Sequence, residues 1–135
     1  MITTEDVYCI LHDVCEQFGI KEIYGKYNTP TGKVKTERIV IRTGSQGNGE
    51  IWEKSFVNIN FCVPNLFNGD ANKIRLQEIE RMVKPVFKRG DTVFLKGSHC
   101  DYENGGDDWL STEEDTELKC HYVNVRILFK VLNVD

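Results

Sequence analysis

The stretches Phe56-Val57-Asn58-Ile59-Asn60-Phe61 and Tyr122-Val123-Asn124-Val125-Arg126-Ile127 decide the fold, because each runs from an aromatic residue and a Val-Asn pair into alternating apolar and polar residues. Side chains alternate between the two faces of a strand, so this period of two predicts two long strands with one face each in the core. The opposite face mixes polar and apolar residues, which is typical of a strand whose outer side meets a partner or a covering segment. These runs indicate architecture and assembly rather than catalysis.

Two amphipathic helices are predicted beside these strands, over residues 3–18 and 71–88, where apolar residues recur every three or four positions. Thr3 can cap the first helix and Gly19 can end it. Pro85 interrupts the second helical pattern, so we expect it to kink or shorten that helix.

The remaining strands are predicted from runs of apolar and β-branched residues between glycine-rich connections. We expect strands at 34–43, 51–63, 92–96 and 118–134, a loop at 24–33, a glycine-rich turn at 44–49 and an acidic loop at 97–117. The order is helix, strand, strand, helix, strand, strand. This order predicts an α+β fold with a single, mostly antiparallel sheet that carries both helices on one face.

Length and composition favour a single domain spanning residues 1–135, since one core usually occupies about 100 to 150 residues. Five cysteines without a C-x-x-C pair indicate reduced thiols and an intracellular protein. The N-terminus does not resemble a secretory signal, and no run approaches the roughly 20 apolar residues of a membrane span. A net charge of -4 argues against nucleic acid as a partner.

The charge is unevenly distributed along the chain. Residues 101–117 hold eight acidic residues and no Lys or Arg, which leaves thirteen acids against seventeen bases elsewhere. We therefore expect one acidic projection on a mildly basic body.

Metal and nucleotide sites are weakly supported by the sequence. Gly32-Lys33 lacks the spacing and the hydroxyl residue of a phosphate-binding loop. The acidic stretch fails the pattern of a helix-loop-helix calcium site, because Thr112 stands where its last carboxylate ligand belongs. His99-Cys100 and Cys120-His121 would approach each other if the last two strands paired across the acidic loop, which leaves zinc open as an alternative.

An enzyme is not expected from this sequence. Cys100, His121 and Asp101 form a conceivable nucleophile, base and orienting group, but nothing local marks any cysteine as activated. We assign no catalytic, cofactor-binding or metal-binding residues.

The order of elements, with residues 56–64 and 121–134, resembles the tail-terminator, or tail-completion, proteins of long-tailed bacteriophages and prophages. The first segment is a strand that ends in Val-Pro before a loop and a helix, and the second is a Val-Asn-Val-Arg-Ile run that closes the chain. The resemblance covers most of residues 3–134. The long acidic segment and Pro85 depart from it.

This resemblance implies a virion structural protein that forms a ring, with a hexamer as the expected form, caps the tail tube and provides the surface that joins the head. Its partners would be its own copies, the tail-tube protein and head-connector proteins, in the virion and in the bacterial cytoplasm during assembly, with no cofactor. Head-to-tail contacts join two different patches of one subunit, so the acidic projection could meet basic residues of a neighbour. The interface candidates are Trp52, Phe56, Asp107, Asp108, Trp109, Leu110, Glu113 and Glu114.

Two other functions stay open at this point. One is a head-tail joining protein or another small phage structural protein, and the other is a small metal-dependent enzyme that uses His99, Cys100, Cys120 or His121.

Overall fold

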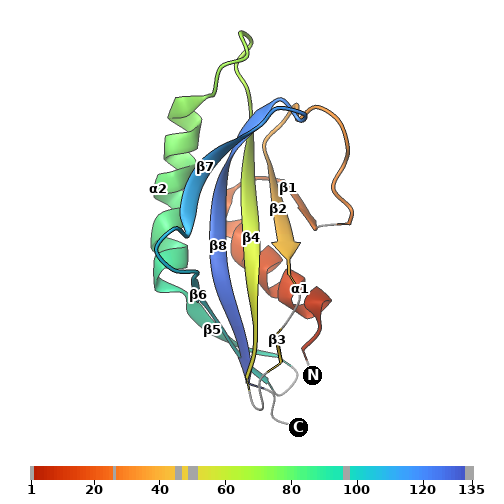
Figure 1. The fold of residues 1–135 in the computed structure, drawn as a ribbon, viewed down its shortest axis with the longest axis vertical. Coiled ribbons are helices and arrows are strands. Elements are labelled where there is room, and N and C mark those ends of the chain that lie inside the picture. The colour runs from red at the N-terminus through yellow and green to blue at the C-terminus, as the bar shows by residue number, and fades with distance from the viewer. Residues whose placement is uncertain (1, 26, 45–46, 49–51, 96–97, 133–135) are drawn as a thin grey trace.

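The chain is an α+β protein with two helices behind a curled sheet (Figure 1). The computed structural model describes residues 2–25, 27–44, 47–48, 52–95 and 98–132. In chain order the elements are α1 (Thr4–Cys15), η1 (Glu16–Phe18), β1 (Glu22–Gly25), β2 (Arg38–Thr43), β3 (Gly47–Asn48), β4 (Trp52–Pro64), α2 (Lys73–Arg89), β5 (Asp91–Leu95), β6 (Ser98–Asn104), β7 (Leu110–Asp115) and β8 (Cys120–Leu132).

The two long strands that share the Val-Asn phrase lie side by side at the centre of the sheet. β4 pairs antiparallel with β8 along its whole length, from Trp52 opposite Leu132 to Pro64 opposite Cys120. The main strand order is β1-β2-β4-β8-β6-β5, with β3 paired to β4 and β7 to β8. β1 runs parallel to β2 and the other pairs are antiparallel, so the sheet is mixed.

The predicted strand order is wrong in two places. β1 forms where residues 24–33 were expected to begin a loop, because four residues suffice for an edge strand beside β2. β5 pairs with β6 rather than with β8, so the last two predicted strands are not neighbours.

The acidic segment 97–117 is mostly strand, not loop. β6 and β7 follow one another along the same edge of β8, and Ser98, Cys100 and Tyr102 are buried. The acids predict a solvated loop, but in β6 they alternate with these buried residues. Glu103, for example, faces out and pairs with Lys130 at 2.8 Å.

A short bulge separates β6 from β7. Gly105 N donates to Arg126 O at 2.9 Å and Arg126 N donates to Trp109 O at 2.7 Å, so both ends of the bulge are held by one residue of β8. We call residues Gly106, Asp107 and Asp108 between them the acidic bulge.

α1 begins directly after its predicted cap, Thr3. Thr3 Oγ1 accepts from Asp6 N at 3.1 Å while Thr3 N donates to the Asp6 carboxylate at 3.0 Å, which closes a capping box. α2 begins two residues later than expected, after Asn72, whose side chain accepts from Arg75 N. The prediction that Pro85 would shorten α2 is wrong: Pro85 and the residue four positions before it are exposed, so water can bond the carbonyl that proline leaves free.

The core lies between the helices and one face of the sheet, as the alternation predicts. Phe61 of β4 meets Phe18 edge to face at 5.5 Å between ring centroids, and Phe87 of α2 lies 5.9 Å from Phe18 and 6.4 Å from Tyr102 of β6. These four rings therefore connect η1, α2, β4 and β6. Among the described residues, no helix has both the length and the apolar character needed to cross a membrane.

Candidate functional site

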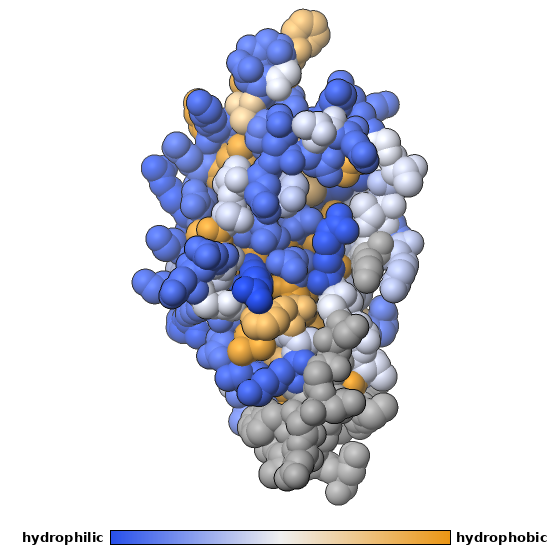
Figure 2. All heavy atoms as spheres, in the orientation of Figure 1, coloured by the Kyte–Doolittle hydropathy of each residue, from blue (hydrophilic) through white to orange (hydrophobic). Residues whose placement is uncertain are grey.

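The helices leave the other face of the sheet open, and four neighbouring strands arrange their outward side chains there in rows. The pairing register places them as Arg42, Asn58 and Arg126, then Val40, Asn60, Asn124 and Ser111, then Arg38, Cys62, Tyr122 and Glu113. Figure 2 shows this face as mostly hydrophilic, with an apolar area toward its lower part.

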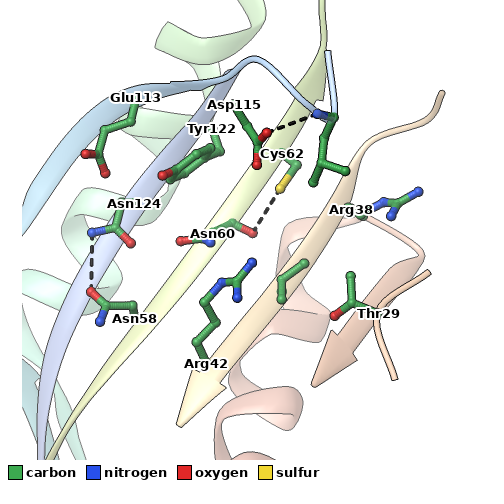
Figure 3. Close-up of a pocket in the computed structure, with 12 residues that line it drawn as sticks. Thr29, Arg38, Arg42, Asn58, Asn60, Cys62, Glu113, Asp115, Tyr122 and Asn124 are labelled. Carbon is green, nitrogen blue, oxygen red and sulfur yellow. Dashed lines mark hydrogen bonds between the residues drawn. The ribbon is translucent and has the colours of Figure 1, made fainter. Parts of the chain in front are cut away.

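A groove of about 290 Å³ follows these rows (Figure 3). β2, β4, β8 and β7 all contribute to it, together with the segments before β2 and after β7. Its lining residues are Thr29, Arg38, Val40, Arg42, Asn58, Asn60, Cys62, Glu113, Asp115, Leu118, Tyr122 and Asn124.

Three asparagines form the floor of the groove. Asn124 Nδ2 donates to Asn58 Oδ1 at 3.3 Å across β8 and β4. Asn60, directly opposite Asn124, is 7% exposed, and its side chain makes no hydrogen bond to any described residue. The amide atoms of Asn60 still reach solvent, so the floor offers the groove donors and acceptors that the described chain does not use.

The β2 side of the groove is basic. Arg38 is 7% exposed, its Nη1 donates to Pro30 O at 3.3 Å, and its buried Nε has no hydrogen-bond partner among the described residues. Arg42 extends from β2 with its guanidinium toward Asn60 (Figure 3). Within the described chain, no carboxylate lies within 4.0 Å of either guanidinium.

The β7 side is acidic. Glu113 is exposed opposite Tyr122, and Asp115 accepts a hydrogen bond from Leu118 N at 3.0 Å. Neither carboxylate forms an ion pair with a described Lys or Arg. The groove therefore has one basic wall and one acidic wall, which lie about 14 Å apart at three strand spacings.

A small apolar cluster closes one end of the groove. Val34, Val40, Cys62 and Cys120 are buried there. A hydrogen bond between the two thiols, together with burial, raises the pKa of Cys62 above its ordinary value. Cys62 is therefore a neutral packing residue at physiological pH, not a nucleophile.

A second exposed feature is the turn between β4 and α2, which we call the apolar tip and define as Leu66 and Phe67. Phe67 is 110% exposed. Two backbone hydrogen bonds of 2.8 Å, from Leu66 N to Asp70 O and from Gly69 N to Leu66 O, hold the turn. The turn projects beyond the end of the sheet (Figure 1), so the protein presents an aromatic ring on a structured support.

The interface candidates fall into separate places. Trp52 opens β4, but its side chain lies outside the described residues. Phe56 is 43% exposed on the open face, with the Arg126 guanidinium 3.9 Å from its ring centroid. Asp107 and Asp108 are exposed in the acidic bulge.

The other four candidates divide between core and surface. Trp109 and Leu110 are partly buried and pack against the core of their own chain, which leaves them little area for a partner. Glu113 faces the groove, whereas Glu114 faces the helix side, where its carboxylate lies 3.6 Å from His121 Nε2. Adjacent strand residues point to opposite faces, so these two acids do not form one patch.

The proposed pairing of His99-Cys100 with Cys120-His121 is wrong. Cys100 lies opposite Val131 and Cys120 begins β8, so about 11 residues of extended strand, roughly 35 Å, separate the two clusters. The same distance separates Cys100 and Asp101 from His121, so this triple does not assemble. Burial raises the pKa of Cys100, and that of Cys15 to about 12, which disfavours the reactive thiolate.

One cluster of metal-ligand type occurs within the described chain, at His12 and Asp13 of α1 and Glu16 of η1. Its carboxylates are exposed, and His12 lies 3.1 Å from Glu16 as an ordinary pair one helical turn apart.

The sequence reading missed the groove and the apolar tip. The Val-Asn repeat itself carried the signal for the groove, because it places Asn58, Asn60 and Asn124 on the face opposite the core. No local pattern distinguishes Phe67 from any other aromatic residue in a loop.

Comparisons with known proteins provide information on the fold but not on the function. No family model matches the chain, and no curated protein matches it. Four solved chains match it in structure. One of them, which carries no functional name, has a TM-score of 0.53 and 9% identity over 84% of this chain and 81% of its own. This likeness concerns the fold alone.

Proposed function

We propose that the chain is a structural protein of a long bacteriophage or prophage tail, where it forms a ring that caps the tail tube and offers the surface that joins the head. The resemblance of residues 56–64 and 121–134 to tail-terminator proteins is the reason for proposing a ring at the end of a tail tube. The observation that carries the subunit's role is the exposure of large apolar side chains at its two ends.

These apolar side chains lie on structured elements at opposite ends of α2. Phe67 and Leu66 form the apolar tip before the helix, and Ile74 in its first turn is 75% exposed. Phe94, on the edge strand β5 just after the helix, is 76% exposed. Seventeen helical residues separate the two ends by about 25 Å. Two different patches on one subunit are what a head-to-tail ring contact requires.

Charge supports the same arrangement. Asp107 and Asp108 are exposed in the acidic bulge, while α2 exposes basic residues at its C-terminal end, among them Lys84, Lys88 and Arg89. A neighbouring copy can therefore bring opposite charges together, which favours a defined orientation. Glu113 and Glu114, on opposite faces, do not take part as one unit.

Phe67→Ser is expected to weaken self-association at least ten-fold, because a buried phenylalanine contributes about 1.5–3 kcal/mol to a contact. Mass photometry of the purified chain, alone and with tail tubes that lack a cap, measures the mass and the occupancy of the ring. Tyr27→Ser is the matched control at another exposed aromatic residue. A wild-type chain that stays monomeric at all concentrations and does not bind tube ends contradicts the proposal.

Asp107→Asn with Asp108→Asn is expected to weaken assembly and to reduce its salt dependence, because exposed charge pairs are screened by salt. Light scattering at low and at high ionic strength checks this. If the double variant assembles with the wild-type affinity and salt dependence, the acidic bulge lies outside the interface.

The alternatives make different predictions. A head-tail joining protein would be found at the head connector rather than at the tube end in electron micrographs of purified particles. A metal-dependent enzyme would carry a stoichiometric metal, which elemental analysis measures. A gene position beside tail-tube and tape-measure genes supports the tail terminator.

A further inference from the structure

The groove on the open face contains charges and amides that the protein does not use itself. Asn60 is almost fully buried, yet its amide lacks a partner among the described residues, and the buried Arg38 has an Nε without an acceptor. Burial of the Arg38 Nε without an acceptor costs free energy in the unliganded state, whereas the Asn60 amide remains open to solvent and to a ligand. Both side chains line the same groove (Figure 3).

We infer that this groove binds an extended peptide segment of a partner protein, with an acidic residue at the β2 wall and a basic residue at the β7 wall. The guanidinium groups of Arg38 and Arg42 suit a carboxylate, because their planar N–H groups can bond both of its oxygens. Glu113 and Asp115 suit a Lys or Arg side chain. The asparagine floor can both donate to and accept from peptide groups, since each amide has both functions.

The shape of the groove favours a chain over a small molecule. It lies open across four strands rather than enclosed, and its charged walls are about 14 Å apart. An extended peptide covers this distance in about four residues, at roughly 3.3 Å each. A free carboxylate reaches one wall only and leaves the acidic wall without a partner.

The test pans a phage-displayed library of random heptapeptides against the immobilised full chain, and then measures the affinity of the selected peptides by fluorescence anisotropy. Selected sequences are expected to contain an Asp or Glu separated by three to five positions from a Lys or Arg. In an NMR titration, the side-chain amide signals of Asn58, Asn60 and Asn124 are expected to shift.

Two variants separate binding from folding. Arg42→Gln removes an exposed guanidinium and is expected to weaken peptide binding about ten-fold or more, with an unchanged unfolding temperature. Asn60→Leu, of similar volume, is expected to weaken binding by a similar factor while the unfolding temperature stays the same or rises, since no hydrogen bond is lost. Arg81→Gln, on the exposed side of α2, is the matched control and should bind as the wild type does.

Three outcomes overturn the inference. In the first, the selected peptides bind Arg42→Gln and Asn60→Leu as tightly as they bind the wild type. In the second, the library yields no enrichment. In the third, succinate at the same concentration as the peptide displaces the peptide completely. The binding experiment needs only the single chain, so its failure does not affect the proposed ring, and failure of ring assembly does not affect the groove.

Discussion

Replacing Gly90 by alanine is expected to lower the free energy of unfolding by about 3–5 kcal/mol. Gly90 ends α2 and turns the chain into β5. Its backbone has φ 69° and ψ -172°, a conformation that residues other than glycine rarely adopt. A Cβ atom placed there would lie 2.0 Å from the Tyr102 carbonyl oxygen, which is backbone and cannot rotate away. The substitution therefore adds a steric clash to backbone strain.

Urea denaturation measures this effect, with Gly19→Ala as the control. Gly19 also has a positive φ, 75°, but a Cβ there would meet nothing within 4 Å, so only the strain of about 1–2 kcal/mol is expected. If Gly90→Ala loses no more stability than Gly19→Ala does, then the backbone at the end of α2 and in β6 can move apart at little cost in free energy.

Phe87→Ala is expected to cost about 3–5 kcal/mol. The ring is fully buried and lies between Phe18 and Tyr102, so its removal opens a cavity where α2, η1 and β6 meet. These elements come from distant parts of the chain, and local rearrangement cannot fill the space without moving a helix.

Phe94→Ala is the matched control for the core substitution. The same side chain is removed from a position that is 76% exposed, where a change within about 0.5 kcal/mol is expected. Thermal unfolding of both variants checks the contrast. Equal losses of stability in the two variants would mean that Phe94 is covered in solution. If neighbouring copies in a ring cover it, the loss in Phe94→Ala disappears on dilution below the assembly concentration; if its own chain covers it, the loss remains.

The two proposed functional surfaces use different parts of the fold. The apolar tip and Phe94 lie at the ends of α2, whereas the groove occupies the face of the sheet that the helices leave open. Core variants such as Phe87→Ala should therefore affect both surfaces equally, while Phe67→Ser and Arg42→Gln should each affect one.

The acidic segment shows where a reading of the sequence fails. Residues 98–115 hold β6 and β7, but their acids suggested a solvated loop, because the buried partners Ser98, Cys100 and Tyr102 are weak hydrophobic signals. β1 was missed for a related reason: a parallel edge strand of four residues is stabilised by β2 rather than by its own composition. The zinc alternative failed because it required β5 and β8 to be neighbours. β6 lies between them and places Cys100 opposite Val131, far from Cys120.

The sequence by itself determined the two long central strands, their core face, the two helices and the cap of the first helix, because alternation with period two, helical spacing and capping residues are local properties of the chain. Tertiary structure alone decided which strands became neighbours, and hence that Arg38, Arg42, Asn60 and Glu113 line one groove while Cys100 and His121 lie far apart. Strand order results from competition among edges for hydrogen bonds and from the fit of side chains across the whole sheet. No short stretch of residues contains that information.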